Sequence, residues 1–338
     1  MGQVVSERGT EYTMEAPAAS PGLALNERSW AIAERLIVDA AASRVAVDVL
    51  SNGARVIDAG IEIDGGLAAG AALGAMCMGG LGAITFVPVE LGGRSWPGVH
   101  VATDHPAVSC MASQYAGWAI KVGDFFGMGS GPLRAHVRAE TELYAKLRYA
   151  ERATRGVLVL ETRSPVTEAV AAWIAERSGL DPARLTLAVA PTASLAGGVQ
   201  IVARVLETGL HKMDALGFDV TRVVSGIGTA PLAPVAKNDL RAIGRTNDCI
   251  LYGSRAHFTV RADDDTLASL AERLPASASK DYGTPFYEIF KRYDNDFYKI
   301  DPLLFSPAAV SLTSTITGRT FTGGRVDADV LHRSLFES

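Results

Sequence analysis

The chain lacks the features that mark several large classes of protein. It has only three cysteines in 338 residues, Cys77, Cys110 and Cys249, and no C-x-x-C pair. An odd number of scattered cysteines does not make a disulfide framework, so we predict a reducing, cytoplasmic setting. Basic runs are also missing, and the formal net charge is -5. The charge pattern therefore indicates neither a nucleic-acid partner nor a polybasic membrane contact.

Histidines are few and poorly spaced for metal binding. The six lie at positions 100, 105, 136, 211, 257 and 332, with no H-x-x-x-H or H-E-x-x-H motif. His100 and His105 lie near Asp104, but this spacing is more typical of a loop than of a ligand set. We predict no metal site.

A typical membrane span is missing as well. Residues 65–89 carry no charge, but 13 of these 25 residues are Gly or Ala, and long aliphatic side chains are too few for a span. Gly66, Gly70 and Gly74 lie four residues apart, so one side of a helix there has almost no side chains. In a membrane this would indicate a dimerisation face. We favour a soluble helix packed very close to a neighbouring backbone.

What is present is typical of a globular protein, with 48% hydrophobic and 20% charged residues. Residues 1–25 are predicted to be a flexible leader. Helices and strands alternate without a regular βαβ repeat, which favours an α+β fold over a doubly wound sheet. We predict two α+β domains, 26–150 and 151–338, with the boundary near the charged residues 151–155.

Hydrophobic periodicity and turn residues predict the individual elements. Glycine-rich loops are expected at 125–132, where Ser130 would cap a helix reaching residue 149, and at 226–234. Asn52-Gly53 predicts a hairpin turn. Predicted helices are 28–42, 106–118, 167–177 and 264–274; predicted strands are 44–50, 54–58, 83–89 (buried), 99–103, 156–160, 184–190, 249–252, 256–261, 310–317 and 320–322.

A polar stripe on an otherwise apolar helix, between residues 191 and 217, is the most informative pattern. At 100° per residue, Gln200, Arg204, Glu207 and His211 lie within roughly 60° of one another. The Arg204/Glu207 pair has two readings. It is either a surface ion pair worth about 0.2–0.5 kcal/mol, or a carboxylate general base kept ionised by its guanidinium neighbour.

Two further segments also have two readings each. Ser130 and Gly131 belong either to a helix cap or to an anion site of free N–H groups. Residues 245–248 are either a turn between a helix and a strand or hydrogen-bonding groups at the edge of a pocket. The aromatic segments 282–286 and 297–298 are more typical of core than of a ligand stack.

Several short motifs occur in one order along nearly the whole chain, from about residue 26 to about residue 326. Together they resemble the methenyltetrahydromethanopterin cyclohydrolase family. The motifs are Ser51-Asn-Gly-Ala-Arg-Val-Ile-Asp58, Gly127-Met-Gly-Ser-Gly-Pro132, Ala190-Pro-Thr-Ala-Ser194 with Ala203-Arg-Val-Leu-Glu207, Gly244-Arg-Thr-Asn-Asp248 with Tyr252-Gly253, Tyr282-Gly-Thr-Pro-Phe286 and Phe297-Tyr-Lys-Ile-Asp301.

The resemblance implies two α+β domains with a pterin pocket between them, assembled as a homotrimer. It also implies reversible hydrolysis of a cyclic methenyl pterin to N5-formyl-tetrahydromethanopterin, with no metal or redox cofactor, in formaldehyde oxidation or a methanogenesis-type pathway. Arg204 and Glu207 match the family's catalytic pair, and Glu161 is similar in position to a further glutamate. Residues predicted to bind the substrate are Asn52, Ser130, Gly131, Ser194, Gln200, Arg245, Asn247 and Asp248.

The chemistry suits this pair. Glu207 would accept a proton from water, and Arg204 would orient Glu207 and lower its pKa. Two alternatives stay open: a catalytically silent pterin-binding or assembly protein, and a cyclohydrolase for the folate analogue. The folate enzymes use a dinucleotide-type fold with a Tyr and a Lys, an arrangement that this sequence does not show.

Overall fold

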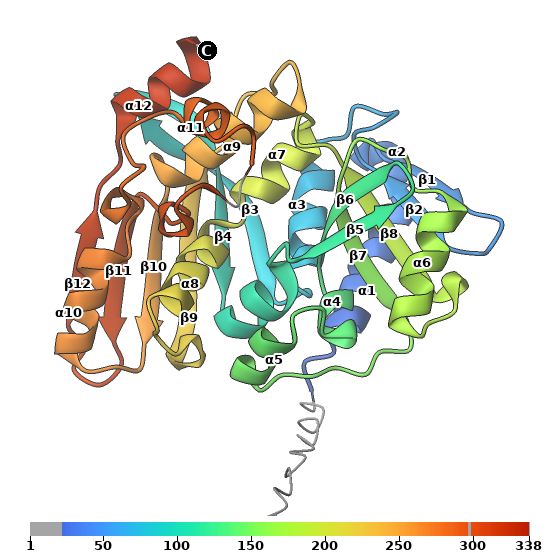
Figure 1. Ribbon diagram of the computed structural model, residues 1–338, viewed down its shortest axis with the longest axis horizontal. Helices are drawn as coiled ribbons and strands as arrows, with labels where there is room; N and C mark the ends of the chain where they lie inside the picture. The colour runs from blue at the N-terminus through green and yellow to red at the C-terminus, as the bar shows by residue number, and fades with distance from the viewer. Residues whose placement is uncertain (1–21, 297–298, 338) are drawn as a thin grey trace, which may run out of the picture.

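Two six-stranded mixed sheets with helices between them make up the chain, an α+β architecture (Figure 1). The computed structural model describes residues 22–296 and 299–337. The strand order is β1-β2-β8-β7-β6-β5 in sheet A and β12-β11-β10-β9-β4-β3 in sheet B. The α+β fold predicted from the sequence is confirmed.

Each sheet combines strands from both sides of the domain boundary predicted near residue 150, which therefore does not coincide with a division between sheets. The domain division itself stays a prediction. Sheet A contains β1 (Ala46–Val49), β2 (Arg55–Asp58), β5 (Trp118–Val122), β6 (Phe125–Ser130), β7 (Gly156–Glu161) and β8 (Leu185–Ala190). Sheet B contains β3 (Gly82–Leu91), β4 (Arg94–Thr103), β9 (Val223–Pro231), β10 (Arg255–Val260), β11 (Ala309–Ser314) and β12 (Thr320–Gly324).

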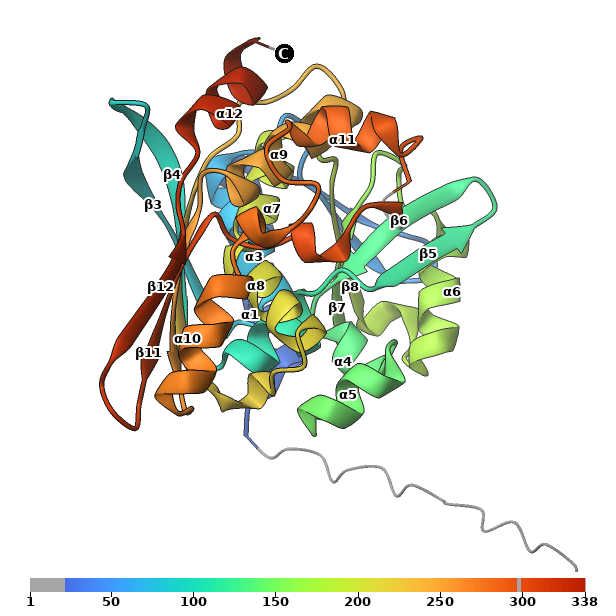
Figure 2. The same cartoon turned by 60° about the vertical axis from the view of Figure 1, so that its left-hand side comes forward.

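Helices α3 and α7 lie between the two sheets in both views, and Figure 2 shows α8 between them as well (Figures 1 and 2). The helices are α1 (Leu25–Val38), α2 (Ala40–Ser43), α3 (Leu67–Cys77), α4 (Leu133–Val137), α5 (Thr141–Leu147), α6 (Glu168–Ser178), α7 (Leu195–Val202), α8 (Val205–Ala215), α9 (Asp239–Leu251), α10 (Asp264–Arg273), α11 (Phe286–Arg292) and α12 (Ala328–His332). Two segments, Ala107–Gln114 and Arg333–Glu337, are π-helical.

The parallel strands β7 and β8 form the centre of sheet A and are covered on both faces. Val157 and Val159 pack with α1 and α3, whereas Leu158 and Leu160 pack on the opposite side with α6. Burial on both faces explains why the sequences of these strands are continuous apolar runs and do not alternate between apolar and polar residues. Their carboxyl ends lead to Glu161 and, through residues 191–194, to α7.

The glycine-spaced helix α3 packs directly against α7, as predicted for a soluble helix. A Cβ added at Gly70 would lie 2.6 Å from Val199 Cβ and 2.9 Å from the Ala196 carbonyl oxygen. Only glycine allows this approach of the two backbones. No helix in residues 22–296 and 299–337 has the length and apolarity that crossing a membrane requires.

The predicted loop at 226–234 is wrong, since most of it belongs to β9. Gly226 and Gly228 face α8, and a Cβ added at Gly228 would lie 2.6 Å from Val205 Cγ1. These glycines let a helix approach a strand closely. The sequence shows glycines but not which neighbour requires them.

Four other predictions also need correction. The 125–132 segment is not a loop, because β6 pairs with both β5 and β7. Ser130 does not cap α4, whose N-cap is Pro132. Residues 249–252 do not form a strand, because they complete and follow α9. The strand predicted to be buried, β3, is mostly exposed at the edge of sheet B.

Candidate functional site

The predicted striped helix is two helices with a break at residues 203–204. Arg204 takes the N-cap position of α8, so Glu207 lies in that helix's first turn. Gln114 Nε2 donates a hydrogen bond to the Ala203 carbonyl at 3.2 Å. Because a side chain inserted at a helix carbonyl is a common cause of a kink, this contact accounts for the break. The prediction of one continuous helix is therefore wrong at this point.

Arg204 is buried and its guanidinium is held in place from two sides. Nη1 donates to the Gln114 carbonyl at 2.6 Å, and Nη2 donates to Gln200 Oε1 at 3.2 Å. The Glu207 carboxylate lies 3.9 Å from Nη1, and the two side chains expose only 9% and 8% of their surface. The interpretation of this pair as a solvated surface ion pair is therefore wrong, because both side chains are buried.

Burial changes the protonation behaviour of Glu207. Desolvation raises the pKa of its carboxyl above the usual 4.5, while Arg204, His211 and Arg134 act in the opposite direction without cancelling it. Arg204 lowers this pKa, as predicted, but the desolvation of the carboxyl is larger and sets the net direction. A carboxylate with a raised pKa is better matched to accepting a proton near neutral pH.

Glu207 interacts electrostatically with three basic residues, Arg134, Arg204 and His211. We call these four residues the Arg204 cluster. Arg134 is fully buried, forms a 2.6 Å ion pair with Glu140 and donates to the Ser113 carbonyl at 3.1 Å. The His211 ring stacks on Tyr115 with centroids 5.3 Å apart. The cluster thus places one carboxylate among groups that favour its ionised form, inside a region that opposes ionisation.

Gln114 connects the two sides of this arrangement and was missed by the sequence reasoning. Its carbonyl accepts hydrogen bonds from Arg204 and, at 2.5 Å, from the Ser130 hydroxyl. Its side chain is fully buried, and Oε1 has no hydrogen-bond partner among the described residues. A single glutamine in an apolar segment carries no sequence signal, because its importance comes from contacts 16 and 90 residues away.

Other predicted residues converge on the same region. Glu161 ends β7, and its carboxylate accepts a 2.5 Å hydrogen bond from Thr192. Burial raises the pKa of the Cys77 thiol, which is also influenced by Arg204, Ser130 and Glu161. The structure therefore brings these three predicted residues together around one buried thiol.

Gly131 and Ser194 belong to the surrounding framework. Gly131 follows β6 with φ +112°, and its N–H donates to the Ser113 carbonyl at 2.8 Å. Ser194 caps α7, accepting from Gly197 N at 3.0 Å. Both residues fix the backbone close to the predicted catalytic groups.

Asn52 lies elsewhere. It sits in the β1–β2 hairpin and donates to the Glu168 carbonyl at 3.3 Å. The strand register aligns Arg55 with Thr186, and Thr186 with Val157, so this hairpin lies at the end of sheet A opposite to Glu161. The structure does not bring Asn52 to the Arg204 cluster.

Arg245, Asn247 and Asp248 lie on α9, not in the predicted turn. Asn247 donates to the Ile243 carbonyl within the helix at 2.8 Å, and Asp248 is fully buried. Arg245 lines a cavity that does not include the Arg204 cluster. Of the aromatic segments, Phe286 is buried core, and 297–298 lie outside the described residues.

Comparison with known proteins gives a consistent result. Residues 24–335 match the family model described as "Cyclohydrolase (MCH)". Proteins named methenyltetrahydromethanopterin cyclohydrolase are similar over nearly their full length. The one from Methylobacterium organophilum is 46% identical over 326 residues (95% of this chain, 99% of the relative). That from Xanthobacter autotrophicus is 45% identical over 333 residues (97% and 98%), and that from Methanococcoides burtonii is 40% identical over 313 residues (92% and 98%).

Proposed function

Because the chain belongs to the cyclohydrolase (MCH) family, we propose that it hydrolyses N5,N10-methenyl-tetrahydromethanopterin reversibly to the N5-formyl derivative. The observation that carries the residue assignment is the buried Arg204/Glu207 pair at the α7–α8 break. Its separation of 3.9 Å and its near-complete burial suit a base that works on a single water molecule.

The substrate supplies its own electrophile. The methenyl carbon lies between two nitrogens that share a positive charge, so the proposal requires no metal or redox cofactor. Water is the weak partner, because it is a poor nucleophile until a proton leaves. General base catalysis of this kind contributes about 10²–10⁴-fold.

Glu207 takes one proton from water as the oxygen bonds to the methenyl carbon. It then delivers that proton to N10 as the C–N10 bond breaks. The remaining hydroxyl proton leaves as the formyl carbonyl forms, so the overall hydrolysis releases one proton from the cationic substrate. Returning the proton to the leaving nitrogen lets one carboxyl serve both steps.

Arg204 orients the Glu207 carboxylate and stabilises the hydroxylated intermediate. Since Gln114 and Gln200 hold the guanidinium, it is kept from turning freely toward the cationic substrate, which it would repel. Glu161 supplies a second carboxylate in the same region. The predicted substrate-binding residues of this region are Ser130, Gly131, Ser194 and Gln200.

Turnover measured side by side with the two methenyl pterins tests this proposal. We expect loss of the methenyl absorbance with the tetrahydromethanopterin derivative and much slower loss with the folate analogue. Binding without turnover would instead support the silent pterin-binding alternative. Faster turnover of the folate analogue would support the second alternative, a cyclohydrolase for that analogue.

The setting and assembly are also part of the proposal. Cys77, Cys110 and Cys249 are all buried and unbridged, which suits a reducing cytoplasm. We expect a homotrimer serving one-carbon metabolism, in formaldehyde oxidation or a methanogenesis-type pathway. Light scattering of the purified protein would give the subunit number directly.

A further inference from the structure

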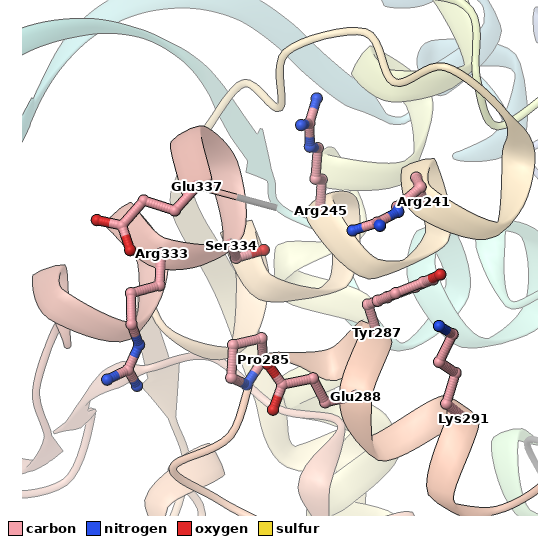
Figure 3. A pocket seen from close by; sticks show the side chains of 9 residues that line it. All are labelled: Arg241, Arg245, Pro285, Tyr287, Glu288, Lys291, Arg333, Ser334 and Glu337. Atoms are coloured by element: carbon pink, nitrogen blue, oxygen red, sulfur yellow. The ribbon is translucent and has the colours of Figure 1, made fainter.

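A second charged region lies on α9, α11 and the C-terminal π-helix, around a cavity of about 320 Å³ (Figure 3). Four basic side chains line it, from Arg241, Arg245, Lys291 and Arg333, against two acidic ones. This excess of positive charge is unexpected in a chain of net charge -5. It lies on structural elements that contribute nothing to the Arg204 cluster.

Three of these cations have no acidic partner among the residues that the structure describes. None of Arg241, Lys291 and Arg333 forms an ion pair with a carboxylate of the residues that the structure describes. Arg241 and Lys291 instead lie over the Tyr287 ring, 4.2 and 4.5 Å from its centroid. Lys291 and, less strongly, Arg241 lower the pKa of the Tyr287 phenol, as expected where positive potential collects.

A buried side chain behind the cavity joins the elements that surround it. Asp248 is fully buried on α9, and its carboxylate accepts from Phe286 N at 2.8 Å and from Ser334 Oγ at 2.5 Å. One side chain thereby joins the three elements that carry the lining cations. The relative positions of the three elements that carry these cations are therefore set by the core of the protein, which favours binding over a diffuse surface charge.

We propose that this cavity binds a small anion bearing phosphate or carboxylate groups, with Arg241 and Lys291 as its principal contacts. Arginine offers a planar fork of N–H donors to such groups, and lysine offers a compact charge. The anionic group has two possible sources: a part of the pterin substrate remote from its ring, which rests on the proposed function, or a separate small molecule.

The test uses the full chain with the double substitution Arg241→Gln and Lys291→Gln, and Arg292→Gln as matched control. Arg292 is an exposed cation on α11 that does not line the cavity. Calorimetric titration with inorganic pyrophosphate measures anion binding, and kcat and KM for the methenyl pterin are measured in parallel. Thermal unfolding checks that all variants fold.

We expect the double variant to lose at least tenfold in one of the two measurements, while the control stays within twofold. Loss of pyrophosphate affinity with unchanged KM indicates a separate anion. A tenfold rise in KM at unchanged kcat indicates an acidic group of the substrate. The proposal is overturned if the pyrophosphate affinity and the KM of the double variant both stay within twofold of the wild type. Because the titration does not require turnover, a failure of the proposed function would not hide this result.

Discussion

The Arg204 cluster and the α9–α11 cavity use charge in opposite ways. In the cluster, Arg204 and Glu207 expose only 9% and 8% of their side chains, and the guanidinium bonds are directed to protein acceptors. Around the cavity, Lys291 and Arg333 are exposed and no described carboxylate pairs with them. Satisfied, desolvated charge suits proton transfer, whereas unpaired, accessible charge suits binding of an ion.

The two regions also differ in how their positions are fixed. In the cluster, the main-chain carbonyl of Gln114 holds Arg204 and also accepts a hydrogen bond from the neighbouring Ser130 hydroxyl. The buried carboxylate of Asp248 joins the elements around the cavity through its bonds to Phe286 N and Ser334 Oγ. Substitutions in the cluster should therefore change the rate of chemistry, and substitutions near Asp248 should change stability. The following experiments test this separation.

Glu207→Gln should have the largest effect, because it keeps the side-chain shape and removes the base. We expect kcat to fall by about 10²–10⁴-fold with little change in stability. Glu272→Gln, on exposed α10 surface, is the control and should be unaffected. Turnover of Glu207→Gln within about threefold of the wild type would show that the base is a different group.

Arg204→Lys should come next. An ammonium cannot reach the Gln114 carbonyl and Gln200 Oε1 in the fork geometry of a guanidinium, so the position of Glu207 becomes less defined. We expect a decrease in kcat of about 10²-fold. The exposed Arg273→Lys on α10 serves as control. Full activity in Arg204→Lys would mean that charge alone is required here.

Gln114→Leu should have a smaller kinetic effect. It removes the hydrogen bond to the Ala203 carbonyl but keeps the main-chain carbonyl that binds Arg204. We expect about tenfold lower kcat with unchanged KM, because only the orientation of α8's first turn is loosened. An equal rise in KM would point to general disruption of the site, against a positioning role.

Asp248 should affect stability in a pH-dependent way. Burial raises the pKa of its carboxyl from 3.8 to about 7. The pKa of Asp248 is higher in the folded state than in the unfolded state, so the folded protein holds the proton more tightly. The resulting contribution to the free energy of unfolding is present at low pH and is lost as the pH rises through about 7. Between pH 6 and 8 we expect a loss of about 1 kcal/mol in the free energy of unfolding, a few degrees in Tm.

Asp248→Asn supplies the comparison for that prediction. The amide can keep both hydrogen-bond partners, Phe286 N and Ser334 Oγ, but does not titrate. Its Tm should change less than that of the wild type over this pH range. Equal pH dependence in the two proteins would show that another group is responsible.

The sequence predicted well where local patterns decide the structure. Apolar runs marked β7 and β8, the Asn52-Gly53 pair marked the β1–β2 hairpin, and Gly179 ended α6. It failed where a distant neighbour decides. The sequence predicts a loop at Gly228, because α8, which requires this glycine, lies about 20 residues earlier in the chain.

The candidate site shows the same limit. Helical periodicity placed Gln200, Arg204 and Glu207 on one face, and the motifs singled out Ser130 and Glu161. The break at Ala203 and the net pKa shift of Glu207 could not be predicted, because both depend on tertiary burial and on Gln114 from another element.

The pH dependence of kcat/KM in the wild-type enzyme tests the central claim most directly. If Glu207 in its ionised form accepts the proton from water, activity must fall on the acid side, with a midpoint above 4.5, since burial raises its pKa. A rate that stays constant down to pH 4.5 would contradict the assignment of this buried carboxylate as the base.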